Sequence, residues 1–230
     1  MLGLSVDEWE ALLLTLGVAL RAVGLGLPLA ILVALVLSRG RFPGRFLLHA
    51  LVHLPLLLPP VVTGWLLLLV FGVNGPAGAL LERLFGFRLV FTEAGASLAC
   101  GVMIFPLMVR AVRLSLEAVD GRLLQAARTL GARPFDRFAS ITLPLALPGV
   151  LAASVLGFTA SLGEFGAVIT FAANIPGETR TLPLAIYAAL ETPGGEAAAA
   201  RLSIVSIALA LLGLGLAEVL SARAGRWRRP

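Results

Sequence analysis

Five apolar segments, each long enough to cross a lipid bilayer, constrain the fold of this chain more than any other feature of its sequence. A spanning helix needs about 20 predominantly apolar residues, because the hydrocarbon core of a bilayer is about 30 Å thick. The segments cover approximately residues 9–37, 46–71, 93–114, 148–173 and 202–220. Since lipid offers no partner to backbone polar groups, we expect these segments to be helices and residues 1–230 to form one all-α, polytopic membrane domain.

Composition excludes several other classes of protein. Hydrophobic residues make up 59% of the chain and charged residues only 13%, whereas about a quarter of a typical soluble domain is charged. All 18 basic residues are Arg. Without Lys the chain cannot form a Walker A loop, so ATP hydrolysis would have to come from a partner. Cys100 stands alone in an apolar segment, which excludes a disulfide framework. The acidic N-terminus, with Asp7, Glu8 and Glu10, is unlike a secretory signal peptide.

The Arg residues predict how the chain is oriented in the membrane, because cytoplasmic loops carry an excess of basic residues. One side of the predicted topology holds Arg39, Arg41, Arg45, Arg110, Arg113, Arg122, Arg128, Arg133, Arg137, Arg223, Arg226, Arg228 and Arg229. The other side holds Arg83, Arg88, Arg180 and Arg201, together with most of the acidic residues. We therefore expect an outside N-terminus and a cytoplasmic C-terminus. The net charge of +5 then reflects topology rather than a nucleic acid partner.

A polar stretch, residues 117–144, separates the third and fourth segments on the predicted cytoplasmic side. Asp120 is placed to cap a helix, because its carboxylate can accept hydrogen bonds from free backbone N–H groups. Gly131 suits the end of that helix, where a positive φ is needed. Pro134 suits the first turn of the next helix, where its missing N–H costs nothing. The pattern predicts a helix, a sharp turn and a second helix.

The order of residues within this stretch resembles the EAA loop of ABC importer permeases. Gln125-Ala126-Ala127 is followed by three residues, Gly131, nine residues, Ile141, one residue and Leu143-Pro144. The family begins its motif with Glu, so Gln125 keeps the shape and loses the charge. The resemblance implies that the loop forms coupling helices in a cleft of a cytoplasmic ATPase, through Glu117, Gln125, Ala126, Ala127, Gly131, Ile141, Leu143 and Pro144. The alternative is an amphipathic hairpin that lies on anionic lipid with its Arg residues outward.

A second resemblance bears on the transported substrate. The run HLPLLLPPVV in the second segment, and the runs SLGEFGAVITFAANIPGETRTLPLAIY and ETPGGEAAAARLSIVSIAL farther along, resemble the permease subunits of molybdate importers. With the EAA loop, the similarity covers approximately residues 43–218. It implies the membrane subunit of an ATP-driven importer of molybdate, and also of tungstate. Sulfate permeases resemble this family, so sulfate or another oxyanion is the alternative substrate.

The same resemblance implies the partners and the location. Two copies of the chain would form the pathway in a bacterial or archaeal cytoplasmic membrane. ATP and Mg²⁺ would bind to two subunits of a partner ATPase, while this chain would bind no cofactor and no metal. An extracytoplasmic molybdate-binding protein would dock on the outer loops, of which residues 174–196 are the best candidate. Within that loop we single out Pro176, Gly177, Glu178 and Arg180.

The fourth segment is the most polar of the five. Ser154, Gly157, Ser161, Glu164 and Val168 fall on one stripe at helical spacing. Ser154, Ser161 and Glu164 are therefore candidates to line a pathway, although small and hydroxyl residues equally suit close helix packing. Glu164 is an acid in the middle of a membrane segment, where a carboxylate usually has a partner. We favour a structural ion pair or a backbone hydrogen bond near the bend at Gly163 and Gly166.

Two rival classes of protein are weaker. A proton-coupled secondary transporter that uses Glu164 would be built from inverted repeats, which we do not recognise in this sequence. An intramembrane enzyme would need a catalytic set, and the chain has neither a His–Glu–His pattern nor a base beside Cys100. Neither class explains the spacing of the EAA loop.

Other features of the spanning segments leave alternatives open. Arg21 lies inside the first segment. We expect one of three arrangements: its side chain reaches the interface, it pairs with an acid, or it marks a change from interfacial to spanning helix. A role for Arg21 in the pathway of an anion is less favoured. His49 and His53 have the spacing of a metal-binding pair, but no further ligand follows nearby, so we favour an interfacial pair. Pro55, Pro59 and Pro60 predict bends in the second segment.

Two connecting stretches are ambiguous. Residues 72–92 contain turn signals and are expected to form a loop. Residues 182–190 are expected to form a short helix or a re-entrant piece rather than a sixth crossing, because a sixth crossing would break the charge bias.

Overall fold

The computed structural model describes residues 3–38 and 42–226, except for the side chains of residues 217, 218 and 220–226. Every regular element in these ranges is helical, which confirms the all-α prediction. The elements are α1 (Val6–Ser38), α2 (Arg45–Leu57), α3 (Pro60–Phe71), α4 (Pro76–Phe85), α5 (Glu93–Glu117), α6 (Gly121–Thr129), α7 (Pro134–Arg137), a π-helical turn (Phe138–Thr142), α8 (Leu143–Leu162), α9 (Gly166–Ala172), α10 (Leu182–Leu190) and α11 (Glu196–Arg226). Arg39, Arg41, Arg228 and Arg229, which entered the orientation argument, lie outside the described residues.

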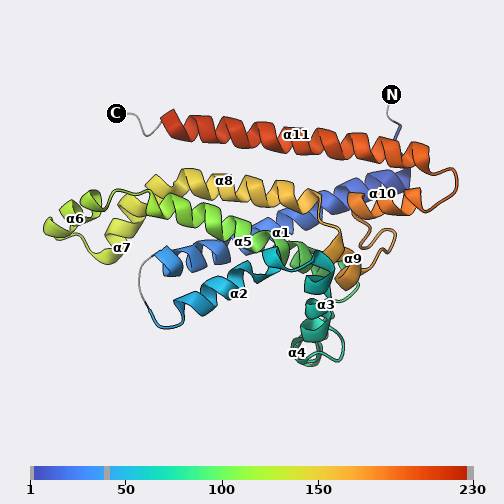
Figure 1. Ribbon diagram of the computed structural model, residues 1–230, viewed down its shortest axis with the longest axis horizontal. Helices are drawn as coiled ribbons and strands as arrows, with labels where there is room; N and C mark the ends of the chain where they lie inside the picture. Colours follow the sequence, from blue (N-terminus) through green and yellow to red (C-terminus); the bar gives the residue numbers. More distant parts are fainter. Residues whose placement is uncertain (1–2, 39–41, 227–230) are drawn as a thin grey trace.

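Four helices are long and apolar enough to cross a membrane, and the bent pair α2 and α3 provides a fifth crossing if the two halves count as one span. The four are Val6–Ser38, Glu93–Glu117, Pro134–Leu162 and Glu196–Leu216. In Figure 1, α1, α5, α8 and α11 run along the long axis of the molecule, and α5 packs against both α1 and α8. The α6–α7 pair lies at one end of this bundle, whereas the start of α1 and α10 lie at the other.

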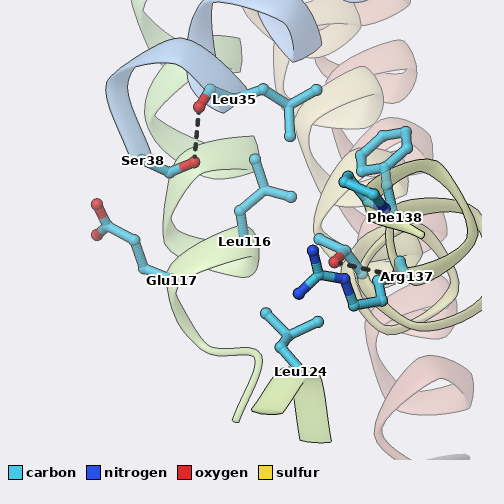
Figure 2. A pocket seen from close by; sticks show the side chains of 9 residues that line it. Leu35, Ser38, Leu116, Glu117, Leu124, Arg137 and Phe138 are labelled. Carbon is cyan, nitrogen blue, oxygen red and sulfur yellow. Dashed lines mark hydrogen bonds between the residues drawn. The ribbon is translucent and has the colours of Figure 1, made fainter. Parts of the chain in front are cut away.

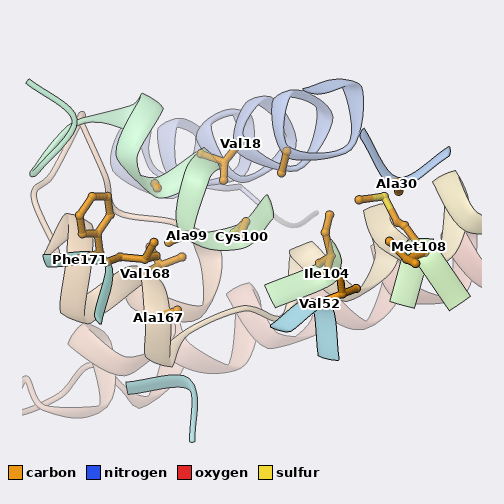
Figure 3. Close-up of a cluster of buried hydrophobic side chains, with 14 of the residues drawn as sticks. Val18, Ala30, Val52, Ala99, Cys100, Ile104, Met108, Ala167, Val168 and Phe171 are labelled. Atoms are coloured by element: carbon orange, nitrogen blue, oxygen red, sulfur yellow. The ribbon is translucent and has the colours of Figure 1, made fainter. Parts of the chain in front are cut away.

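Small side chains allow α1 and α5 to approach closely. Five alanines on these helices have no exposed surface: Ala19, Ala30, Ala34, Ala96 and Ala99. Membrane helices associate through such small residues, because lipid provides no hydrophobic drive and close van der Waals contact must replace it. Figure 3 shows the larger side chains of the same cluster, among them Met108 of α5 and Phe171 of α9. The core therefore centres on α5.

The second predicted segment, residues 46–71, is not a single bent helix. The structure divides it into α2 and α3, whose axes differ by 119°. Leu58 and Pro59 connect them with extended backbone, at ψ values of 148° and 137°. A proline disfavours helical backbone at the residue before it and donates no hydrogen bond itself. The consecutive Pro59 and Pro60 therefore stop the helix instead of bending it.

The bounds of the fourth predicted segment, residues 148–173, were also wrong. Its helix begins at Pro134 and runs through the π-helical turn and α8, so residues 134–144 of the polar loop are continuous with the span. The helix ends at Leu162, and α9 forms a separate helix after a short break. In that break the Glu164 carboxylate accepts a hydrogen bond from the backbone N–H of Ala167 at 3.0 Å. This bond satisfies one of the free backbone N–H groups in the first turn of α9.

The two ambiguous stretches resolve differently. Residues 72–92 are not a simple loop, because they contain α4. Pro76 occupies the first turn of α4, and Gly86 follows its end with a φ of 65°, the proline-first and glycine-last arrangement that helices favour. Residues 182–190 form the predicted short helix, α10, which packs against α11 and α1.

Candidate functional site

The predicted helix–turn–helix is present at one end of the bundle, as α6 and α7. The Asp120 carboxylate accepts a hydrogen bond from the backbone N–H of Arg122 at 2.8 Å, at the start of α6. Gly131 follows α6 with a φ of 81°. The N–H of Ala132 reaches back to the carbonyl of Ala127 at 3.0 Å, the hydrogen bond of a left-handed helix end. Pro134 then lies in the first turn of α7. Local signals alone therefore predicted this hairpin.

The hairpin carries exposed apolar side chains. No residue of α6 is buried; Gln125 and Ala126 are exposed, and Ala127 is half-buried. Leu123 and Leu130 are 48% and 87% exposed. Large exposed apolar side chains gathered on a polar segment mark a surface that a partner covers. The small side chains of Ala126 and Ala127 leave room for a partner's backbone on this surface.

The hairpin is joined to the spans unequally. Residues 118–120 link α5 to α6, whereas α7 continues into α8 without interruption. Ile141 lies in the π-helical turn, and Leu143 and Pro144 lie in the first turn of α8. The hydroxyl of Ser115 on α5 donates to the carbonyl of Ala146 on α8 at 3.1 Å. One continuous helix thus joins α7 to α8, and α8 is hydrogen-bonded to α5.

A cavity of about 380 Å³ lies between the hairpin and the ends of the spanning helices. Figure 2 shows its lining, which includes Leu35 of α1, Leu116 and Glu117 of α5, and Leu124 of α6. Glu117 is engaged by Arg113, whose Nε donates to its carboxylate at 2.7 Å. The candidate coupling residue Glu117 therefore lies at the wall of this cavity.

The polar stripe of the fourth segment does not run through one helix. Ser154 and Ser161 lie on α8, and their hydroxyls donate to the carbonyls of Leu151 and Gly157 at 2.7 and 2.9 Å. Glu164 lies beyond the end of α8, at the start of α9. Glu164 thus lies outside the helix that carries the two serines, although its backbone N–H still donates to the carbonyl of Ser161 at 3.2 Å. It contains the backbone hydrogen bond that we favoured for this carboxylate.

The outer loop candidate forms an exposed tip on a buried base. Pro176, Gly177 and Glu178 are exposed, whereas Thr179 is fully buried. Thr179 holds the base: its hydroxyl accepts from the N–H of Ile175 at 3.0 Å and donates to the carbonyl of Ala173 at 3.3 Å. The half-buried Arg180 donates through Nε to the Asn174 side chain at 2.9 Å. The tip is therefore held in a defined shape.

Sequence reasoning missed two polar contacts that hold this end of the molecule together. Arg201 on α11 donates to the Glu8 carboxylate on α1 at 2.7 Å, and the Glu8 side chain is only 7% exposed. The N–H of Leu182 at the start of α10 donates to the hydroxyl of Thr15 at 2.7 Å. The partners are far apart in the chain, so the only sequence signal was the presence of polar residues in apolar helices.

The structure also bears on two alternatives from the sequence. Arg21 forms an ion pair with Glu93 of α5, which is the pairing option among those considered. His49 and His53 stack with their ring centroids 4.2 Å apart. In the part of the chain that the structure describes, no group of three His, Cys, Asp or Glu residues is arranged to hold a metal ion.

Comparison with known proteins places this arrangement in a family. Residues 26–226 match the model of the family described as binding-protein-dependent transport system inner membrane component. The chain belongs to this family. It is 55% identical over 227 residues to the molybdenum transport system permease protein ModB of Escherichia coli K12, covering 97% of this chain and 99% of that protein. It is 40% identical over 196 residues to the sulfate transport system permease protein CysT of Salmonella typhimurium, and that match covers 85% of this chain and 70% of CysT.

A solved structure has the same fold. The crystal structure of a bacterial alginate ABC transporter, in complex with an alginate-bound periplasmic protein, contains a chain that matches with a TM-score of 0.76. That match has 19% sequence identity and covers 95% of this chain and 80% of the other. Family membership makes this chain a multi-pass inner-membrane component of a transport system rather than an enzyme.

Proposed function

We propose that this chain is the permease subunit of an ATP-driven importer of molybdate, and also of tungstate. The observation that carries the proposal is the 55% identity to ModB of Escherichia coli, which extends over 97% of this chain. The match also covers 99% of that protein, so the similarity is not confined to one part of the chain. ATP and Mg²⁺ would be bound by the partner ATPase, because this chain lacks the Lys of a Walker A loop.

The ATPase binds the α6–α7 hairpin through Gln125, Ala126, Ala127 and the turn at Gly131. This assignment is supported by the exposed apolar side chains of the hairpin, which this chain leaves uncovered. Closure of the ATPase dimer moves the hairpin, and the continuous helix Pro134–Leu162 carries the movement into the bundle. Such a rigid-body movement is a common way to alternate access between two faces of a membrane.

A second copy of the chain covers the break between α2 and α3. Irregular backbone at membrane depth is tolerated only where protein covers it or where it lines a water-filled cavity. Leu57, Pro59 and Pro60 at this break are exposed in the single chain, and consecutive prolines leave carbonyl groups without helical donors. The pathway then runs between the two copies, with the half-buried Ser154 as a candidate lining residue, whereas Ser161 is buried within the single chain, at 4% exposed.

The extracytoplasmic binding protein docks on the tip at residues 176–178. This chain is oriented with its N-terminus outside and its C-terminus in the cytoplasm. The tip and the hairpin lie at opposite ends of the bundle (Figure 1), as docking on one face and ATPase binding on the other require.

In Glu178→Arg we expect binding of the binding protein to weaken about fivefold to tenfold, because a charge at an interface rim is reversed. Glu191→Arg, with the same charge change beyond α10, is the control. Surface plasmon resonance on nanodiscs gives both affinities, and equal affinities would refute docking at the tip.

The proposed function is tested by uptake into proteoliposomes that contain this chain, its ATPase and its binding protein. Molybdate uptake should require ATP on the ATPase side and the binding protein on the other. Excess tungstate should inhibit molybdate uptake more than excess sulfate does, because tungstate resembles molybdate in size and charge, whereas sulfate is smaller. Preferential inhibition by sulfate would instead favour the second candidate function, a sulfate permease, which the 40% identity to CysT supports.

The Glu164→Gln variant separates the importer from a proton-coupled secondary transporter. The Glu164 carboxylate accepts a backbone hydrogen bond at the start of α9, and the side-chain carbonyl of Gln can accept the same bond. We expect ATP-driven uptake to stay within about twofold of wild type, whereas Glu164→Ala leaves the N–H unpaired and lowers uptake further. Uptake by the chain alone under a pH gradient, lost in Glu164→Gln, would replace the importer with the secondary transporter.

A further inference from the structure

The cavity beneath the α6–α7 hairpin contains a positive charge that no described residue neutralises. Arg137, at the end of α7, lines the cavity, and its guanidinium points toward Leu116 and Leu124 in Figure 2. Its Nε is buried and has no hydrogen-bond partner among the residues that the structure describes. A buried donor without a partner is costly. The cavity is thus suited to an anionic group that accepts from Arg137.

The rest of the lining restricts the kind of anion. Leu35, Leu116, Leu124 and Phe138 make most of the wall apolar. The nearby hydroxyl of Ser38 is already committed as a donor, to the carbonyl of Leu35 at 3.0 Å. Glu117, which also lines the cavity, is paired with Arg113. One guanidinium in an apolar wall fits an anion with an apolar body better than a small, fully hydrated oxyanion, which needs many donors.

A second, apolar hollow adjoins the first. It has a volume of about 270 Å³, and it shares Leu35, Pro134 and Phe138 with the cavity while adding Phe135. The two together form one amphipathic cleft, with a charge at one end and an apolar groove at the other. The cleft lies near the ends of three spanning helices. Leu35, which lines it, is three residues before the last residue of α1. The cleft also contacts the end of α5 and the residues that precede α8. This is the depth at which lipid headgroups meet acyl chains.

We infer that this cleft binds one anionic phospholipid, whose phosphate accepts from Arg137 and whose acyl chain lies along Phe135 and Phe138. The site is separate from the ATPase surface of the hairpin, because it faces the ends of α1 and α5. A lipid held there ties the hairpin to the membrane surface and fills the space into which α7 would otherwise move. With the orientation proposed above, the cleft opens to the cytoplasmic leaflet, where anionic lipids are abundant in cell membranes.

Native mass spectrometry of the full-length chain, released from detergent with added phosphatidylglycerol or phosphatidylcholine, tests the inference. We expect wild type to retain one phosphatidylglycerol in preference to phosphatidylcholine. Arg137→Gln should lower that retention about fivefold, the effect of removing one basic residue near an anionic lipid. The matched control is Arg128→Gln, which removes an exposed Arg of the same hairpin outside the cleft; its retention should change less than about twofold. Leu124→Trp fills the cavity without removing charge and should lower retention as well.

Several outcomes would overturn the lipid site. Equal retention of the two lipids, or an equal loss in Arg137→Gln and Arg128→Gln, would mean that surface charge alone attracts lipid. Displacement by millimolar inorganic phosphate would mean a site for a free anion. Displacement by the purified ATPase would mean that the cleft receives a side chain of that partner. Because the measurement needs neither ATP nor a transported oxyanion, its failure would leave the proposed function unaffected.

Discussion

Gly131→Val is expected to lower ATP-driven uptake at least about tenfold while the chain still inserts into the membrane. Gly131 has a φ of 81°, where a β-branched residue is strained by about 1–3 kcal/mol. A Cβ atom added to Gly131 would meet no other atom within 4 Å, so the effect comes from backbone conformation and not from a clash. The strained turn reorients α7 relative to α6, and the ATPase then meets a hairpin of the wrong shape.

The measurement compares uptake and ATP hydrolysis in the same proteoliposomes. Gly131→Asn is the matched control, because Asn tolerates left-handed backbone and should retain uptake to within about threefold. Hydrolysis that continues in Gly131→Val without uptake would identify uncoupling at the hairpin. Wild-type uptake in Gly131→Val would refute the coupling role of this turn.

Gly149→Ala is expected to destabilise the chain at the contact between α5 and α8. A Cβ atom on Gly149 would lie 2.1 Å from the Cβ of Ser115 and 2.4 Å from its hydroxyl. Overpacking of this kind costs about 1–3 kcal/mol, so the melting temperature in detergent should fall by about 5 °C. The Ser115 hydrogen bond to Ala146 should also weaken, because α8 must move away. Uptake should fall as well, because α8 carries the movement of the hairpin.

Two variants separate overpacking from a general effect of the substitution. Gly215→Ala on α11 introduces the same methyl group where no atom lies within 4 Å, and it should be neutral or slightly stabilising. In the Ser115→Gly background, which makes room for the methyl group, Gly149→Ala should cost much less stability than it does in the wild-type chain. Equal melting temperatures for Gly149→Ala and Gly215→Ala would contradict the close approach of α5 and α8.

The hairpin was predictable because each of its signals acts within a few residues. The Asp120 cap, the positive φ at Gly131 and the first-turn Pro134 are all local, and each is present in the structure. The short helix α10 was predictable for a similar reason, since Pro and Gly residues bound its apolar run. Local backbone chemistry needs no knowledge of the rest of the fold.

The breaks in the spans were harder to predict, because apolar composition does not distinguish a bend from a break. Pro59 and Pro60 indicated an irregularity in the second segment. They did not indicate the 119° angle between α2 and α3, or that α3 packs against α9. A Cβ atom on Gly64 would lie 2.7 Å from the Cβ of Thr170, so this packing requires glycine. Nothing in the sequence joins Gly64 to a helix a hundred residues later.

The sequence by itself determined that this chain spans a membrane with helices and that a helix, a turn and a second helix follow Asp120, because hydropathy and helix ends are properties of short segments. Only the tertiary structure decided which charges pair, as for Arg21 with Glu93 and Glu8 with Arg201. It also decided that Glu164 leaves the stripe of Ser154 and Ser161, and that Arg137 faces a cavity. These outcomes depend on which helices become neighbours, and helix packing is set by the fit of whole surfaces rather than by any single segment.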